Sequence, residues 1–132
     1  MTWGLAPTAI AAFYRKGRGT SPVLRSKAWC CRVVDWTVAR PDGSARLDVR
    51  ITLRTDDDAL VYAHYNGVLH APAGVIGRLR GGEPVDPGEY YFRGAPFFET
   101  SSPKYAWLTM IVAVGAGRRG PADVSDTVHE LL

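Results

Sequence analysis

The fold is decided by the stretch ARLDVRITLRT, residues 45–55. Apolar side chains stand at every second position, at Leu47, Val49, Ile51 and Leu53, and mostly charged or polar residues fill the positions between them. Successive side chains of a β-strand point to opposite faces, so this period of two predicts a strand with one apolar and one polar face. Strands of this kind are typical of antiparallel sheets.

Turn signals punctuate the rest of the chain at intervals of about ten residues, as in meandering antiparallel sheets. Further strands are expected over residues 33–40, 59–69, 90–100, 105–115 and 124–131. Residues 73–80 follow a proline, keep apolar residues near helical spacing and end at two glycines, which predicts one short helix. The fold class is therefore all-β, and sheets that curl until each edge finds a partner become barrels.

Length and composition indicate one globular domain over residues 1–132. The chain has a mass of 14.4 kDa, 46% hydrophobic residues and 22% charged residues, which excludes disordered, collagenous and membrane-spanning classes. The apolar stretch 3–14 is too short to cross a bilayer, and its positive charges follow it instead of preceding it as in a secretory signal. We expect a cytoplasmic protein that does not bind membranes.

Positive charge is concentrated at the start of the chain. Residues 1–40 hold seven basic residues against Asp35 alone, while the whole chain has a formal charge of +3. Clustered cations could meet nucleic acid or anionic lipid, but a solvated basic surface is the simpler interpretation. We therefore expect no nucleic-acid partner.

Cysteine and histidine spacing gives no metal site. Cys30 and Cys31 are adjacent, so they cannot link distant segments. Free thiols are the simplest interpretation, with a strained vicinal disulfide as the alternative. His64, His70 and His129 form no spaced ligand set, and we expect no bound metal.

Residues 115–120 match the GxGxxG pattern of dinucleotide-binding proteins. Pro121 follows at once, and the last twelve residues leave no room for the helix and second strand that such a site needs. We interpret this segment as a glycine-rich loop between strands and expect no cofactor.

The polar face of residues 45–55 carries Asp48, Arg50 and Thr52. The pattern alone leaves open whether this face meets solvent or lines the lumen of a barrel. The functional hypothesis puts it in the lumen, where Arg50 would anchor an oxyanion or carboxylate and Asp48 would handle protons together with Asp35. Glu99, between Phe98 and Thr100, is the acid most expected to enter apolar surroundings, where a carboxyl group becomes suited to proton transfer.

Aromatic residues concentrate in the second half of the chain. Such residues are commonly core, yet a cavity for a small hydrophobic ligand needs an apolar wall. The residues expected to form this wall are Trp36, Tyr62, Tyr91, Phe97, Tyr105 and Trp107.

Several separate blocks carry a family resemblance: residues 46–57, 60–62, 82–93, 96–100 and, as the best signature, Lys104-Tyr105-Ala106-Trp107-Leu108. From about Asp35 to the C-terminus the chain resembles the domain of unknown function family 3237. The resemblance implies an antiparallel β-barrel, lipocalin-like in outline. Members are poorly characterised, and some sit in natural-product pathways where cyclase, isomerase or hydrolase roles are suggested.

Residues 1–34 depart from the family and form an atypical segment with poor order expected in its aperiodic part, residues 15–32. A shortened start implies a barrel that lacks a strand, and an uncovered sheet edge invites pairing with a second chain. A homodimer is expected for this reason. Asp58 stands where the family has glycine, in a turn whose left-handed backbone costs a side-chain-bearing residue roughly 1 kcal/mol or more.

The leading functional hypothesis is a cofactor-independent isomerase, cyclase or hydrolase acting on a small hydrophobic carbonyl or polyketide-like compound inside the barrel. A barrel that binds such a compound without catalysis is the alternative.

Overall fold

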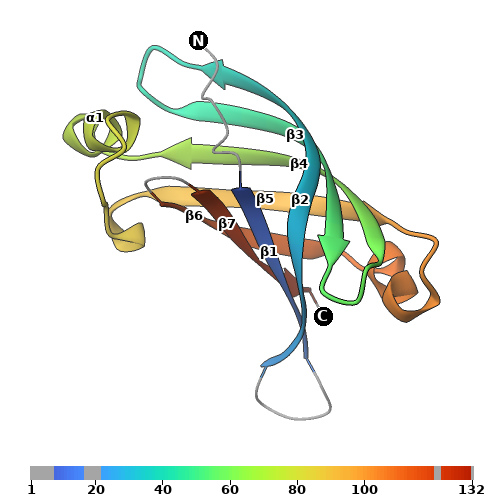
Figure 1. Ribbon diagram of the computed structural model, residues 1–132. Coiled ribbons are helices and arrows are strands. Elements are labelled where there is room, and N and C mark those ends of the chain that lie inside the picture. Colours follow the sequence, from blue (N-terminus) through green and yellow to red (C-terminus); the bar gives the residue numbers. More distant parts are fainter. Residues whose placement is uncertain (1–7, 17–21, 121–122, 132) are drawn as a thin grey trace.

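Seven strands form a closed barrel in the computed structural model, which describes residues 8–16, 22–120 and 123–131 (Figure 1). The strands are β1 (Thr8–Lys16), β2 (Pro22–Ala39), β3 (Ala45–Thr55), β4 (Leu60–His70), β5 (Tyr91–Glu99), β6 (Ala113–Arg119) and β7 (Asp123–Glu130). The helices are α1 (Ala73–Arg80) and the 3₁₀ helices η1 (Pro87–Glu89) and η2 (Pro103–Met110). Each strand pairs antiparallel with the next along the chain. The predicted antiparallel β-barrel with one short α-helix is confirmed.

The barrel closes through a parallel pairing of β1 with β7, in register from Thr8 opposite Asp123 to Tyr14 opposite His129. Because β1 also pairs with β2, this strand has a neighbour on each side. The expectation that the start of the chain lacks a strand and leaves an uncovered edge is therefore wrong at β1. The nine residues of β1 fill that place.

The long strand β2 carries a β-bulge. Cys30 pairs with Leu53 and Arg32 pairs with Thr52, so Cys31 is the extra residue between them. A bulge bends and twists its strand. Both cysteines are free thiols, with Cys31 exposed and Cys30 partly buried. The aperiodic segment expected over 15–32 thus includes the end of β1 and much of β2, while residues 17–21 lie outside the described residues.

The apolar row of β3 lines the interior. Leu47, Val49, Ile51 and Leu53 are at most 7% exposed. They pack with inward residues of β2 and of β4 to β7, and with α1, in one hydrophobic core. Burying this row, and not the charged one, avoids the cost of desolvating unpaired charges.

The strand expected over residues 105–115 is wrong in its first half, which forms η2 instead. Pro103 begins this helix, and proline is favoured in a first turn. Tyr105 and Leu108 are both buried. Their spacing of three residues suits a 3₁₀ helix, in which residues i and i+3 lie on one side.

The glycine-rich segment 115–120 is not a loop, since β6 runs through it to Arg119. Gly115 and Gly117 are buried positions of this strand. At Gly117 an added Cβ would overlap the ring of Phe92, so glycine is required for the barrel to accommodate that ring.

The turn between β3 and β4 holds Asp58 at φ 69°, the left-handed conformation anticipated there. Arg54 donates a hydrogen bond to its carboxylate at 3.1 Å. Aspartate tolerates this backbone better than most residues because its short polar side chain can bond locally.

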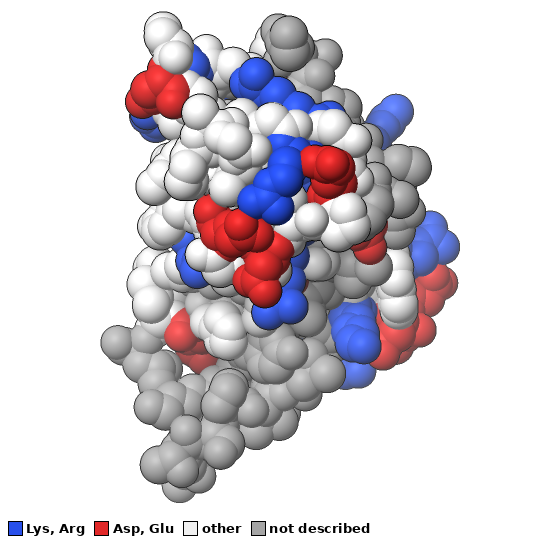
Figure 2. Space-filling view, turned by 90° about the vertical axis from the view of Figure 1, so that its left-hand side faces the viewer, with Lys and Arg blue, Asp and Glu red and all other residues white. Residues whose placement is uncertain are grey.

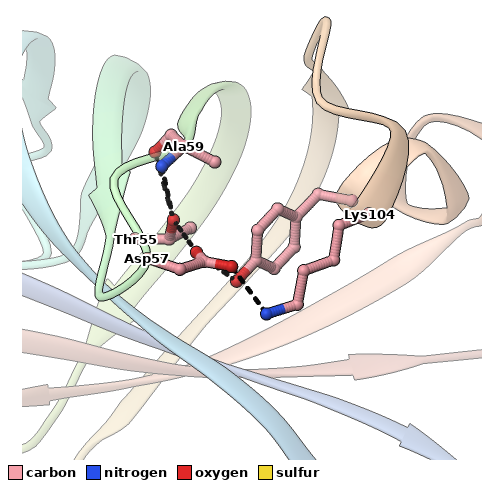
Figure 3. A network of polar contacts seen from close by, with 5 residues as sticks. Thr55, Asp57, Ala59 and Lys104 are labelled. Carbon is pink, nitrogen blue, oxygen red and sulfur yellow. Dashed lines mark hydrogen bonds and ion pairs between the residues drawn. The ribbon is translucent and has the colours of Figure 1, made fainter.

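A polar network ties the same turn to η2 (Figure 3). Asp57 accepts hydrogen bonds from the Thr55 hydroxyl at 2.6 Å, the Tyr105 hydroxyl at 2.8 Å and the Lys104 ammonium group at 2.6 Å. Thr55 in turn accepts from the amide of Ala59 at 2.9 Å. The Lys104 bond, followed by those from Thr55 and Tyr105, holds the pKa of Asp57 well below its usual range. The network anchors η2 at the end of the barrel opposite α1 (Figure 1).

Substitution Asp57→Asn is expected to lower the melting temperature at neutral pH. A carboxyl group with a lowered pKa stabilises the folded state above its unfolded-state pKa of about 4, and this contribution is lost as the pH falls through the folded value. The difference in melting temperature between the variant and the wild type should therefore become smaller as the pH of the thermal melts is lowered from about 6 to about 2. Asp58→Asn, which removes an exposed ion pair from the same turn, should change the melting temperature little. A pH-independent loss in Asp57→Asn would contradict the proposed role of the charge.

Candidate functional site

The polar row of β3 lies on the outer surface of the barrel. Arg50 is exposed, and Asp48 and Thr52 are half-buried on the face opposite the buried apolar row. Asp48 contacts the Arg50 guanidinium at 3.5 Å and Nε2 of His64 at 2.9 Å. The prediction that these residues line the lumen is wrong, because the outer surface lets both charges stay hydrated.

Glu99 is also exposed on the outer side of β5, so the apolar surroundings expected for it are not found. Four of the six expected wall residues likewise point outward, with exposed fractions between 39% and 67%. They are Tyr62, Tyr91, Phe97 and Trp36. Tyr105 and Trp107 both belong to η2. Tyr105 is buried and donates a hydrogen bond to Asp57, and Trp107 packs against the core. The structure therefore does not bring the expected wall together.

Asp35 is the one expected acid that points inward. It lies in a row with Val49 and Tyr65, since Asp35 pairs with Val49 and Val49 pairs with Tyr65 across β2, β3 and β4. Burial raises the pKa of Asp35, against the effect of a hydrogen bond of 3.0 Å that the Thr37 hydroxyl donates to its carboxylate.

A second acid, Asp126 on β7, reaches the same interior. Burial raises the pKa of Asp126 to about 6. Burial also raises the pKa of Tyr65, and the charges of Asp126 and Asp35 raise it further. Tyr65 thus stays protonated throughout the physiological range, with two carboxyl groups and the thiol of Cys30 near enough to act on it.

Glycines in the wall make room for these side chains. Gly67, Gly94 and Gly115 are paired in one row across β4, β5 and β6. A Cβ at Gly94 would lie 3.0 Å from the Tyr65 ring, and a Cβ at Gly115 would lie 3.4 Å from Oδ1 of Asp126. The ring and the carboxyl group therefore rest against neighbouring glycines of the wall. We define Asp35, Tyr65 and Asp126 as the interior acid cluster.

The interior acid cluster combines three functions that proton transfer needs. A carboxyl group with a pKa near 6 can both take and return a proton near neutral pH. A neutral tyrosine hydroxyl donates a hydrogen bond to an oxygen on which negative charge develops. A second carboxyl group, Asp35, supplies another acid or base.

Tyr65 and Asp126 were missed in the sequence analysis, although a signal for each exists. Tyr65 stands among Val61, Ala63 and Leu69, which share its side of β4 and are buried. Asp126 stands between Val124 and Val128, which are both buried. The signal is a single polar residue among apolar residues at every second position of a strand. It was overlooked because the polar face of β3 was chosen as the lumen.

Charges on the described part of the face that carries α1 are mixed in sign (Figure 2). Arg78 of α1 forms an ion pair with Glu89 of η1 at 2.7 Å.

Among the described residues, no three histidine, cysteine or carboxylate side chains lie together as a metal site would need. None of the described helices is long and apolar enough to span a membrane.

Residues 9–131 match the family model described as protein of unknown function, DUF3237. The chain belongs to the DUF3237 family. Among its relatives, a UPF0311 protein of Clostridium acetobutylicum is 42% identical over 91 residues, which are 69% of this chain and 58% of that protein. A UPF0311 protein of Rhodopseudomonas palustris is 38% identical over 98 residues, covering 74% of this chain and 64% of that protein. This DUF3237 chain thus matches less than two thirds of the length of these relatives.

Solved structures of DUF3237-like chains share the fold. The crystal structure of a conserved protein of unknown function from Rhodopseudomonas palustris superposes with a TM-score of 0.75 at 34% identity, covering 81% of this chain and 72% of that one. A protein from Acinetobacter baumannii described as β-barrel-like gives a TM-score of 0.61 at 35% identity, covering 83% of this chain and 75% of that one.

Substitution Asp126→Asn is expected to stabilise the DUF3237 barrel at alkaline pH. The folded-state pKa of Asp126 is raised, so folding favours the protonated acid, and stability falls as the pH rises from about 4 to about 6. Removing the charge should increase the free energy of unfolding by on the order of 2–3 kcal/mol at about pH 8 and by little at about pH 4. Urea denaturation at both values measures this. Glu99→Gln, on the exposed outer face, is the matched control and should give no such gain; an equal gain in both variants would contradict the burial of Asp126.

Proposed function

We propose that the barrel binds a small, largely apolar carbonyl compound in its interior and catalyses proton transfer at the carbon next to the carbonyl group, as an isomerase or cyclase does. The observation that carries this proposal is Asp126, an acid with a pKa of about 6 inside an apolar barrel. A general acid or base works best when its pKa lies close to the working pH. Exposed carboxyl groups such as Glu99 lack the enclosed surroundings that this role requires.

Asp126 is the proposed general base, because its carboxylate is the prevalent form at neutral pH and yet remains basic enough to take a proton. Tyr65 is the proposed donor to the carbonyl oxygen. Removal of the α-proton by Asp126 forms an enolate, whose negative oxygen the Tyr65 hydroxyl stabilises. In a substrate with a neighbouring double bond, the enolate is conjugated, and return of the proton from Asp126 to the γ-carbon gives an isomer. In a substrate with a second carbonyl group, attack of the enolate carbon on that carbonyl carbon closes a ring, and the alkoxide that forms takes the proton back from Asp126.

Asp35 is the proposed second acid. It faces the interior two strands from Tyr65 in the same row, so it can return a proton at a position that Asp126 does not reach. The charges inside the barrel also favour an uncharged substrate, because an anion would meet two carboxyl groups that already act on Tyr65.

The substrate class follows from the remaining inward residues. Leu53, Phe92, Phe98 and Val128 are buried members of the hydrophobic core, against which Tyr65 packs. An apolar lining with a few converging polar groups suits a hydrophobic molecule with one or two oxygen atoms. A polyketide-like compound is a molecule of this kind.

The test is deuterium uptake from D₂O at the α-carbons of simple ketones, using 2-tetralone and smaller and larger cyclic ketones and following exchange by NMR. The wild type is expected to exchange at least one of them faster than buffer does, with an inflection near pH 6. Asp126→Asn should lose about 10²–10⁴-fold of the enhancement, and Tyr65→Phe about 10²–10³-fold. Glu99→Gln is the control and should retain full activity.

The alternative of a barrel that only binds its ligand gives a different result. Ketones would shift the NMR signals of interior residues in the wild type and in Asp126→Asn alike, with no exchange above buffer in either. That outcome, or exchange that survives Asp126→Asn unchanged, would overturn the proposed catalysis.

A further inference from the structure

The outer surface of β2 to β5 carries large apolar side chains that the core does not use. Four strands lie side by side here (Figure 1). On β2, Val34, Trp36 and Val38 are 49%, 67% and 61% exposed, and on β5, Phe97 is 62% exposed. Exposed apolar side chains beside charged ones on one face are features of an interaction surface. We call the outer side chains of these four strands the outer patch.

Two neighbouring rows of the outer patch are defined by the strand register. The first row contains Val34, Arg50, His64 and Phe97, each opposite the next across β2, β3, β4 and β5. The second row contains Trp36, Asp48, Asn66 and Ala95 in the same order of strands.

The two rows are complementary to one another. Where the first row has the cation Arg50, the second has the anion Asp48. Where the first row has the large Phe97, the second has the small Ala95, and the medium Val34 corresponds to the large Trp36. A two-fold axis that lies across the strands between the rows therefore brings the first row of one copy onto the second row of another copy.

We propose that the outer patch binds a second copy of this chain in a two-fold symmetric, face-to-face dimer. Arg50 of each copy faces Asp48 of the other, Phe97 faces Ala95, and Val34 faces Trp36. An interface of this type is self-complementary, as a two-fold axis requires. Charged pairs at its centre set the register, and the flanking apolar side chains supply the burial.

The charged centre has capacity for the added contacts. The Arg50 guanidinium lies 3.5 Å from Asp48 within its own copy, and the side chains of Arg50 and Asp48 are 46% and 41% exposed. A guanidinium has five N–H donors, so Arg50 can bond the carboxylate of a second copy without giving up its own partner.

The available area is sufficient for a specific contact. The patch is four strands wide, at about 4.8 Å per strand, and about eight residues long, at about 3.3 Å per residue. Its area is therefore on the order of 500 Å² per copy. Two copies would bury on the order of 1,000 Å², the lower bound for specific interfaces. Because the barrel wall is convex, the surfaces diverge on both sides of the charged centre, and the long side chains of Trp36 and Phe97 are suited to bridge that space.

This dimer differs from pairing at a sheet edge, because the described strands of the barrel leave no such edge uncovered at β1. It is also independent of the proposed catalysis, since the outer patch and the interior acid cluster lie on opposite sides of the wall.

Sedimentation velocity and light scattering over a wide concentration range test the proposal. The wild type is expected to approach twice the chain mass of 14.4 kDa as concentration rises. Asp48→Arg and Arg50→Asp should each weaken the dimer at least about tenfold, because each places like charges across the axis. The double variant Asp48→Arg/Arg50→Asp should regain most of the affinity, because the exchange recreates every pair of opposite charges.

Matched controls separate this surface from others. Trp36→Ser should weaken the dimer, whereas Met110→Ser, which removes a 79% exposed side chain on η2, should not. Glu89→Arg reverses the charge in the exposed Arg78 ion pair beside α1 and should leave the dimer intact. Circular dichroism verifies that each variant is folded. A wild type that stays monomeric at all concentrations, or a dimer that neither Asp48→Arg nor Trp36→Ser weakens, would overturn the proposal.

Discussion

Pairing of β1 with β7 is the interaction on which the interior depends. It converts a curled sheet into a closed barrel, so each inward side chain must share one small enclosed space with all the others. Gly117 is a consequence of that limit, because the Phe92 ring occupies the space where its Cβ atom would stand, and a Cβ at Gly94 would lie only 3.0 Å from the Tyr65 ring. Enclosure also removes water from the Asp126 carboxyl group, which raises its pKa.

Enclosure by itself gives Asp126 and Tyr65 different tasks. The raised pKa of Asp126 leaves it able to exchange a proton near neutral pH, while the raised pKa of Tyr65 keeps its hydroxyl as a donor only. The hydrophobic residues around them favour an apolar ligand. The proposed chemistry therefore needs no feature beyond a closed wall and two polar residues placed in apolar rows.

Local patterns were sufficient to predict most of the framework. The alternation in β3 predicted that strand, and Pro72 with the paired glycines 81 and 82 predicted the helix over Ala73–Arg80, since each depends on a few neighbouring residues. The start of η2 was mistaken for a strand because its apolar residues suit both structures until the buried partners of Tyr105 and Leu108 are known. Residues 1–14 fit either a strand or a helix from the sequence, because the pairing with β7 that decides for β1 joins residues more than a hundred positions apart.

The candidate site was harder to predict than the fold, for a specific reason. An alternating strand shows that it has two faces but not which of them points inward. Choosing the charged face of β3 as the lumen led to Asp48, Arg50 and Glu99, whereas the desolvation of charge favours the apolar face. Asp35 was assigned to the interior and points inward, whereas Asp126, a polar residue between the buried Val124 and Val128, was overlooked.

Because the apolar row of β3 points inward, its charged row points outward. The outer wall of β2 to β5 therefore has charged side chains at its centre and apolar side chains beside them. Those residues are free to serve association while the interior serves the ligand, since a β-strand separates its two sets of side chains completely. Mutations on one face are therefore expected to act on one property alone.

The central claim is that Asp126 is an enclosed acid poised near neutral pH, and its titration tests this most directly. Carbon-13 NMR of the side-chain carboxyl groups, with Asp126→Asn used to assign the signal, follows the protonation of this one residue in the folded protein. The account predicts a midpoint for Asp126 at about pH 6. A midpoint near the ordinary aspartate value of about 4 would contradict it.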